Sequence, residues 1–204
     1  MAWRRRSHPD QLQFDFGGGP DEPNRDPVFF ANLIDPAIAS ALERIALAQR
    51  NRFELDGTLR PTQNLHLSLI PIGLRRMLDD RLIDIARQAA STVEMSCFDL
   101  VFDRVMSFKT RQPYPLVLRC GAGSTSITAL YRAIGEAIAG SELRMRAPSS
   151  FTPHVTLLYG SKLVPVTALD EPVTVRVRDF TLVHSLSGKS LYKELGRWPL
   201  RASS

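Results

Sequence analysis

The sequence predicts an α+β fold with a mostly antiparallel sheet, helices packed outside it, and a duplicated β-α-β-β unit. A histidine precedes a hydroxyl residue by two positions in His66-Leu67-Ser68 and again, 88 residues later, in His154-Val155-Thr156. Moving the apolar residues 28–30 and the amphipathic residues 38–46 forward by the same 88 positions reaches a second apolar run and a second amphipathic segment, residues 116–118 and 126–134. Strand, helix and motif strand therefore recur at one spacing.

Local signals place the elements of the first half. Residues 1–26 contain Gly17-Gly18-Gly19-Pro20, few apolar residues and mixed charge, which predicts a disordered N-terminal arm. Asp35 and Pro36 are typical of a helix start, and apolar residues at helical spacing predict a helix over residues 36–50. A loop from Gly57 to Pro61 and a strand over residues 64–72 are expected next. A helix over 78–89 and a strand over 95–108 follow.

The second half repeats this order. We expect a turn at residues 112–115 and an apolar strand at 116–118. A helix should follow, capped by Ser124 or Ser126 and ended by Gly140. A loop at 148–153 then leads into the second motif strand at 154–158. The range from Pro172 to His184 contains Val173, Val175 and Val177 alternating with Thr174, Arg176 and Arg178, which indicates further sheet structure. Residues 27–204 are predicted to form one domain of two lobes, because 204 residues with 44% hydrophobic content suffice for a proper core.

The excess positive charge lies on this domain. The arm has four arginines against five acidic residues, a net charge of −1, so residues 27–204 carry +6 within an overall +5. Such a surface favours anionic partners, including nucleic acid, although a charge that only keeps the protein soluble fits equally well. No apolar stretch reaches membrane-spanning length, and Cys97 and Cys120 lack a Cys-x-x-Cys spacing. We therefore expect a cytoplasmic protein with two buried thiols.

The two motifs carry the chemistry. In a strand, the period of two sends each histidine and its hydroxyl to the same face. Two imidazoles can take a proton from an attacking oxygen and give one to a leaving oxygen near neutral pH, while two hydroxyls donate to phosphate oxygens. The pattern predicts a metal-free site for phosphodiester cleavage, with His66 and His154 catalytic and Ser68 and Thr156 binding phosphate. A single such histidine is more often a core residue, and the duplication favours catalysis.

The residues around both motifs resemble the two-histidine (2H) phosphoesterase superfamily, specifically the bacterial LigT-like RNA 2′,3′-cyclic phosphodiesterases, also called 2′-5′ RNA ligases. Pro61-Thr62-Gln63-Asn64-Leu65-His66-Leu67-Ser68-Leu69 is similar to Pro-x-x-Asn-Leu-His-Leu-Thr-Leu of that branch. Phe151-Thr152-Pro153-His154-Val155-Thr156-Leu157 is similar to its Phe-x-Pro-His-Ile-Thr-Leu. Residues 28–31 and 192–200 resemble its opening and closing segments. The resemblance implies a bilobal fold with pseudo-twofold symmetry and both histidines in a central cleft.

The same resemblance implies a reaction. Water opens a 2′,3′-cyclic phosphate at an RNA or nucleoside end and leaves a 2′-phosphate. His154 would activate the water and His66 would protonate the departing 3′ oxygen. A ribose hydroxyl in place of water would instead form a 2′-5′ linkage. Neither a metal nor a cofactor is implied, and we expect a monomer.

The chain departs from the branch in two places. Tyr159 stands five residues after the second histidine, where the branch often carries an arginine that meets the phosphate, and Lys162 is the nearest cation. Ser68 replaces the usual threonine, which keeps the hydroxyl and loses a methyl group. Phe108 and Tyr114 are candidates for stacking on a base, with core packing an equal alternative for Phe108.

Two other functions fit the same residues. An RNA-binding module would use the basic surface and the aromatic residues and keep the histidine pair as a vestige. An enzyme of the same fold would act on another nucleotide, such as a 2′-5′ oligonucleotide or an ADP-ribose cyclic phosphate. In the arm, the segment from Gln11 to Phe16 faintly resembles the short peptides that dock on bacterial sliding clamps, and an unstructured segment is the main alternative there.

Overall fold

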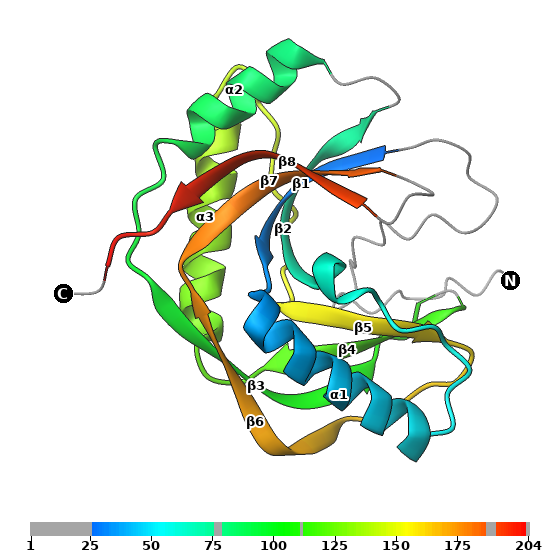
Figure 1. Cartoon of the computed structure of the whole chain (residues 1–204). Helices are drawn as coiled ribbons and strands as arrows, with labels where there is room; N and C mark the ends of the chain where they lie inside the picture. The colour runs from blue at the N-terminus through cyan, green and yellow to red at the C-terminus, as the bar shows by residue number, and fades with distance from the viewer. Residues whose placement is uncertain (1–25, 76–78, 111, 187–190, 203–204) are drawn as a thin grey trace, which may run out of the picture.

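Eight strands of the described residues form one sheet, in the order β6-β3-β4-β5-β2-β1-β7-β8 (Figure 1). The computed structural model describes residues 26–75, 79–110, 112–186 and 191–202. The elements in chain order are β1 (Asp26–Leu33), α1 (Pro36–Arg52), the 3-10 helix η1 (Thr62–Asn64), β2 (His66–Arg75), α2 (Asp80–Ala90), β3 (Phe98–Ser107), β4 (Tyr114–Cys120), α3 (Ser124–Gly140), β5 (His154–Gly160), β6 (Thr167–Val177), β7 (Asp179–Leu186) and β8 (Leu191–Pro199). Neighbouring strands pair antiparallel throughout this sheet, which confirms the predicted α+β class.

The element boundaries reproduce the predicted duplication. Moved forward by 88 residues, α1 coincides with α3, and β2 and β5 both begin at a motif histidine. β1 corresponds to β4, and β3 corresponds to β7 at a shorter offset. The two halves exchange strands, because β3 of the first half pairs with β4 and β7 of the second half pairs with β1. The pseudo-twofold relation therefore passes between β2 and β5.

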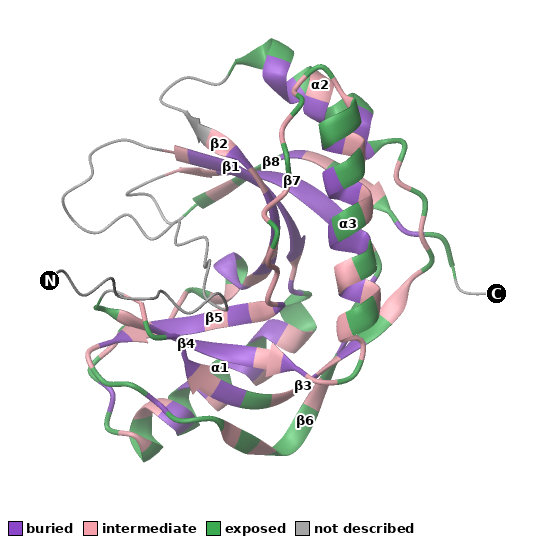
Figure 2. Ribbon diagram, turned by 180° about the vertical axis from the view of Figure 1, so that it is seen from behind, coloured by how far each residue is buried: buried purple, intermediate pink, exposed green. Residues whose placement is uncertain are grey.

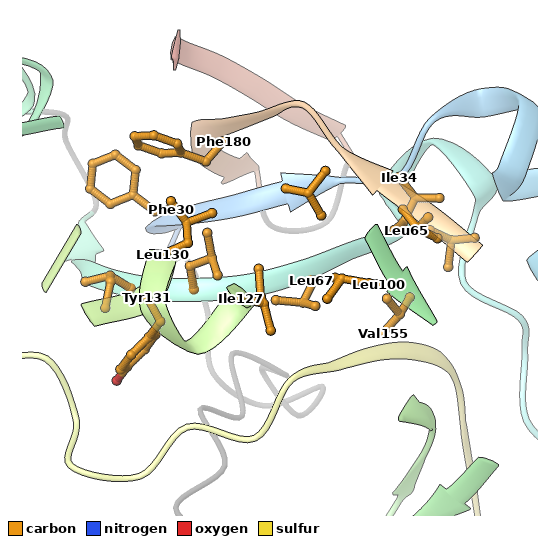
Figure 3. Close-up of a cluster of buried hydrophobic side chains, with 14 of the residues drawn as sticks. Phe30, Ile34, Leu65, Leu67, Leu100, Ile127, Leu130, Tyr131, Val155 and Phe180 are labelled. Carbon is orange, nitrogen blue, oxygen red and sulfur yellow. The ribbon is translucent and has the colours of Figure 1, made fainter. Parts of the chain in front are cut away.

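The two halves of the sheet meet where Leu67 of β2 lies opposite Val155 of β5, which we call the central pair. Neither side chain has exposed surface, and both join a core that includes Leu42 of α1 and Ile127 of α3. Figure 3 shows Leu67, Val155 and Ile127 within this core. α1 contacts β5, whereas α3 contacts β2 and β3. Figure 2 shows buried positions along the central strands and exposed positions on the outer surfaces of α2 and α3. The helices thus enclose the apolar side of the central pair.

The helix starts show one confirmed prediction and one wrong one. The Asp35 side chain accepts a hydrogen bond of 2.8 Å from the Ala37 amide, and Pro36 is the first residue of α1, as expected. Neither Ser124 nor Ser126 caps α3. Gly123 precedes that helix with a φ of 82°, and no side chain of the described residues forms a capping hydrogen bond there. A Cβ at Gly123 would collide with the Asp99 carbonyl, so the close approach of β3 requires glycine here.

The alternating run from Pro172 to His184 divides between two strands. β6 ends at Val177 and pairs with β3 at one end of the sheet, while β7 begins at Asp179 and pairs with β1 and β8 in the other half. Cys97 and Cys120 are both free thiols, but only Cys120 is buried as expected. The predicted arm, residues 1–26, lies outside the described residues except for Asp26, which begins β1. No helix in the described ranges is both long and apolar enough to span a membrane.

Truncating the central pair should destabilise the fold. Because Leu67 has no exposed surface, we expect Leu67→Ala to lower the free energy of unfolding by about 2–5 kcal/mol. Leu163, which is 44% exposed, is the matched control, and Leu163→Ala should change stability by less than about 0.5 kcal/mol. Urea unfolding measures both variants. Equal, small losses in the two would contradict the assigned role of the central pair.

Candidate active site

The four motif side chains form one cluster on the sheet face opposite to the central pair. One step along each antiparallel strand from that pair places Ser68 opposite His154 and His66 opposite Thr156. The Cβ atoms of such cross-strand neighbours lie about 4.5–5.5 Å apart. All four side chains keep part of their surface exposed, whereas the central pair between them keeps none. The register therefore brings both histidines and both hydroxyls together.

The two imidazoles are anchored in the same way. Nδ1 of His66 donates to the Asn64 carbonyl at 2.8 Å, and Nδ1 of His154 donates to the Thr152 carbonyl at 2.7 Å. A carbonyl oxygen can only accept, so each Nδ1 carries a proton and each Nε2 is the atom left for chemistry. In the neutral ring of His66, Nε2 accepts from the Ser68 hydroxyl at 2.9 Å. Within the described part of the chain, Nε2 of His154 has no hydrogen-bond partner.

Aromatic rings pack against both histidines. The Phe29 and Tyr192 ring centres each lie 5.3 Å from that of His66. The Phe108 ring lies 5.0 Å from His154, nearly perpendicular to it. These contacts restrict the orientation of the imidazoles and remove water from one side of each. Because Phe108 is only 7% exposed and packs on His154, its ring offers no open face on which a base could stack.

Two arginines lie beside the histidines. Arg60 donates to the Tyr192 hydroxyl at 2.7 Å, and this hydroxyl is 3.3 Å from Nδ1 of His66. Arg119 lies directly opposite His154 on the neighbouring strand β4. Among the residues that the structure describes, neither arginine forms an ion pair. Two uncompensated positive charges therefore flank the cluster.

These surroundings keep both imidazoles neutral. Burial, together with the charge of Arg60, lowers the pKa of His66 to about 3. Burial also lowers the pKa of His154, and the charge of Arg119 acts in the same direction. A bound anion would favour the protonated rings and raise both pKa values. Within the described ranges, no group of three or more His, Cys, Asp or Glu side chains is placed to hold a metal ion.

The remaining predicted contacts lie around the far end of β5. Lys162 follows that end, with its ammonium 3.6 Å from the Glu54 carboxylate. Tyr114 lies on β4, opposite Gly160, the last residue of β5. The length of β5 from His154 to Gly160 is about 20 Å, so Tyr114 is far from the histidine. Tyr159 lines an open pocket of about 460 Å³ together with Asp56, Gly57, Thr58, Gln112, Pro113, Gly160 and Ser161. The structure thus does not bring Lys162 or Tyr114 to the histidines.

Sequence reasoning missed both arginines and the functional contacts of Phe29 and Tyr192. Arg119 did leave a signal, because it is the only charged residue in the otherwise apolar residues 115–120, where a cation is unusual. Arg60 directly precedes Pro61, the first residue of the segment around the first motif that resembles the family. The ring contacts depend on the pairing of distant strands, which no local pattern reveals.

Comparison with known proteins agrees with the fold. The solved structure of TT0787 of Thermus thermophilus is similar in fold, with a TM-score of 0.66 and 20% identity, and the match covers 87% of this chain and 100% of that one. E. coli LigT in its apo form is also similar, with a TM-score of 0.67 and 21% identity, and the match covers 87% of this chain and 99% of that one. A third, described as a phosphoesterase, has a TM-score of 0.65 and 20% identity over 86% and 99%. No curated protein sequence matches the chain.

The family comparison covers both motifs. Residues 34–189 match the 2′-5′ RNA ligase superfamily. This range includes His66 and His154, both hydroxyl residues beside them, and most of the sheet. Because the match extends over more than half of the sequence and the fold agrees with it, the chain belongs to the 2′-5′ RNA ligase superfamily of two-histidine phosphoesterases.

Proposed function

We propose that this chain is a metal-independent phosphodiesterase that hydrolyses the 2′,3′-cyclic phosphate of an RNA or nucleoside end to a 2′-phosphate. The observation that carries the proposal is the matched anchoring of His66 and His154, which leaves one Nε2 atom on each of two adjoining strands for proton transfer. Water attacks phosphorus and gives its proton to Nε2 of His154. The bond from phosphorus to the 3′ oxygen breaks, and Nε2–H of His66 protonates that oxygen.

The hydroxyls of Ser68 and Thr156 stabilise the charge that develops on the non-bridging oxygens. Ser68 donates to His66 only while that ring is neutral, because a protonated Nε2 can no longer accept. Protonation of His66 therefore releases the Ser68 hydroxyl for the phosphate. The acid is charged and the hydroxyl becomes available in the same event.

The neighbouring solved structures support a nucleotide substrate. E. coli LigT has been crystallised with ATP, NADP+, phosphate and 3′-AMP, all of which present phosphate oxygens. The two flanking arginines of this chain suit the same ligand class. A ribose hydroxyl in place of water would convert the same machinery to 2′-5′ ligation. RNA binding alone would not require two imidazoles that are anchored in the same way.

Removing either histidine should nearly abolish hydrolysis. With a nucleoside 2′,3′-cyclic phosphate and chelator present, we expect His66→Ala and His154→Ala each to lower kcat by about 10²–10⁴, the range for a lost general acid or base. Phosphorus NMR of the product should show a 2′-phosphate. His8→Ala, which changes a histidine outside the described residues, is the control and should retain the rate of the unmodified protein.

Other outcomes identify the alternatives. RNA binding without turnover of any cyclic phosphate would make the chain a binding module. Faster turnover of a 2′-5′ oligonucleotide or an ADP-ribose cyclic phosphate would assign the enzyme to that substrate. A 3′-phosphate product would overturn the proposed regiochemistry.

The lowered pKa values predict an unusual pH profile. In the free protein the pKa values of both histidines lie below the ordinary 6.5, so above that pH His154 is neutral and protonated His66 is progressively lost. We therefore expect kcat/KM to fall about tenfold per pH unit from about pH 6.5 to 8. The bound phosphate anion raises the pKa of the acid, so kcat should decline only at higher pH. Initial rates measured across this range give both profiles. A kcat/KM that increases over this range would contradict the prediction.

A further inference from the structure

Arg119 is a half-buried cation with no anionic partner among the described residues. It lies on β4 between Leu118 and Cys120, both of which are buried. Among the described residues it has no ion pair, and its buried Nε has no hydrogen-bond partner. Burial lowers the pKa of its guanidinium, as expected for a charge removed from water without compensation. Such a group is costly to bury unless a ligand completes it.

The neighbouring arginine on the sheet shows the contrast. Arg104 lies directly opposite Arg119, one strand further from the histidines. Its Nε and one terminal nitrogen donate to the two Asp103 carboxylate oxygens at 2.6 and 2.8 Å. The outer arginine is thus exposed and paired with a carboxylate of its own strand, whereas no carboxylate in the described part of the chain pairs with the inner one beside His154.

The position of Arg119 places its charge at the reaction centre. Arg119, His154 and Ser68 lie in one row across three neighbouring strands, on the same face of the sheet. The Phe108 ring contacts both Arg119 and His154: its centre lies 5.0 Å from that of the His154 ring and 5.9 Å from the guanidinium carbon of Arg119. An anion that meets Nε2 of His154 therefore lies within reach of the guanidinium.

We propose that Arg119 is the cationic ligand of the phosphate bound between the two histidines. The guanidinium fork donates to two non-bridging oxygens, which a planar group with parallel N–H bonds is suited to do. Arg60 shares the buried Nε that has no hydrogen-bond partner among the described residues, but it differs in that a terminal nitrogen of its guanidinium donates to the Tyr192 hydroxyl. The inference rests on the proposed function only in placing a phosphate at His154, and its test requires no turnover.

Arg119→Met tests the proposal, with Arg104→Met as the matched control. Titration calorimetry with inorganic phosphate should show about tenfold to hundredfold weaker binding for Arg119→Met, the effect of one lost charge-assisted contact. Arg104→Met should bind within about twofold of the unmodified protein. NMR titration should also show the pKa of His154 rising in Arg119→Met and unchanged in Arg104→Met, because of the two arginines only Arg119 contributes to the lowered pKa of that ring.

Unchanged phosphate affinity in a folded Arg119→Met variant would overturn the proposal. If that variant does not fold, NMR of the unmodified protein tests the proposal instead. The resonance of the Arg119 Nε–H group should shift on saturation with phosphate, and an unchanged resonance would also overturn the proposal. Weakened phosphate binding by Arg119→Met in a chain that hydrolyses no cyclic phosphate would refute the proposed function and leave Arg119 as an anion ligand. Normal hydrolysis with unchanged phosphate affinity would refute the role of Arg119 alone.

Discussion

The pairing of Leu67 with Val155 determines how the two histidines and the two hydroxyls of the motifs lie relative to one another. Side chains alternate along a strand, so a slip of β5 by one residue against β2 would send His154 and Thr156 into the core and Val155 out of it. Complete burial of the central pair makes that slip costly, since the apolar area it removes from water would be lost. Hydrophobic packing on one face of the sheet thus fixes the register of β2 with β5. That register keeps the two histidines close together on the opposite face.

The electrostatics of that second face make proton transfer dependent on the ligand. Burial and the neighbouring arginines keep the imidazoles neutral, so neither is a ready acid in the unliganded protein. An anionic phosphate supplies the compensation that an imidazolium needs. A ligand without negative charge would leave both rings unprotonated and Ser68 still bonded to His66. Binding of the proper chemical class and formation of the acid are therefore coupled in this account.

The fold was predictable where local signals and one repeated spacing suffice. The period of two around His66 and His154 placed both motif strands, and Asp35 marked the start of α1. Features that depend on the meeting of distant segments were not predictable. Gly123 replaces the expected serine cap because the β3 backbone approaches it. Arg119 reaches His154 only through the register of β4 with β5, whereas Lys162, close to His154 in sequence, pairs with Glu54.

His66 and His154 should act as one unit in a single chemical step, and the rate of the double variant reports this most directly. Single-turnover hydrolysis of a nucleoside 2′,3′-cyclic phosphate can be compared for His66→Ala, His154→Ala and the variant that carries both changes. Groups that share one transition state give non-additive losses, so the double variant should lose about as much rate as the more severe single one. Losses that multiply would contradict a shared step and show that the two halves of the repeat act independently.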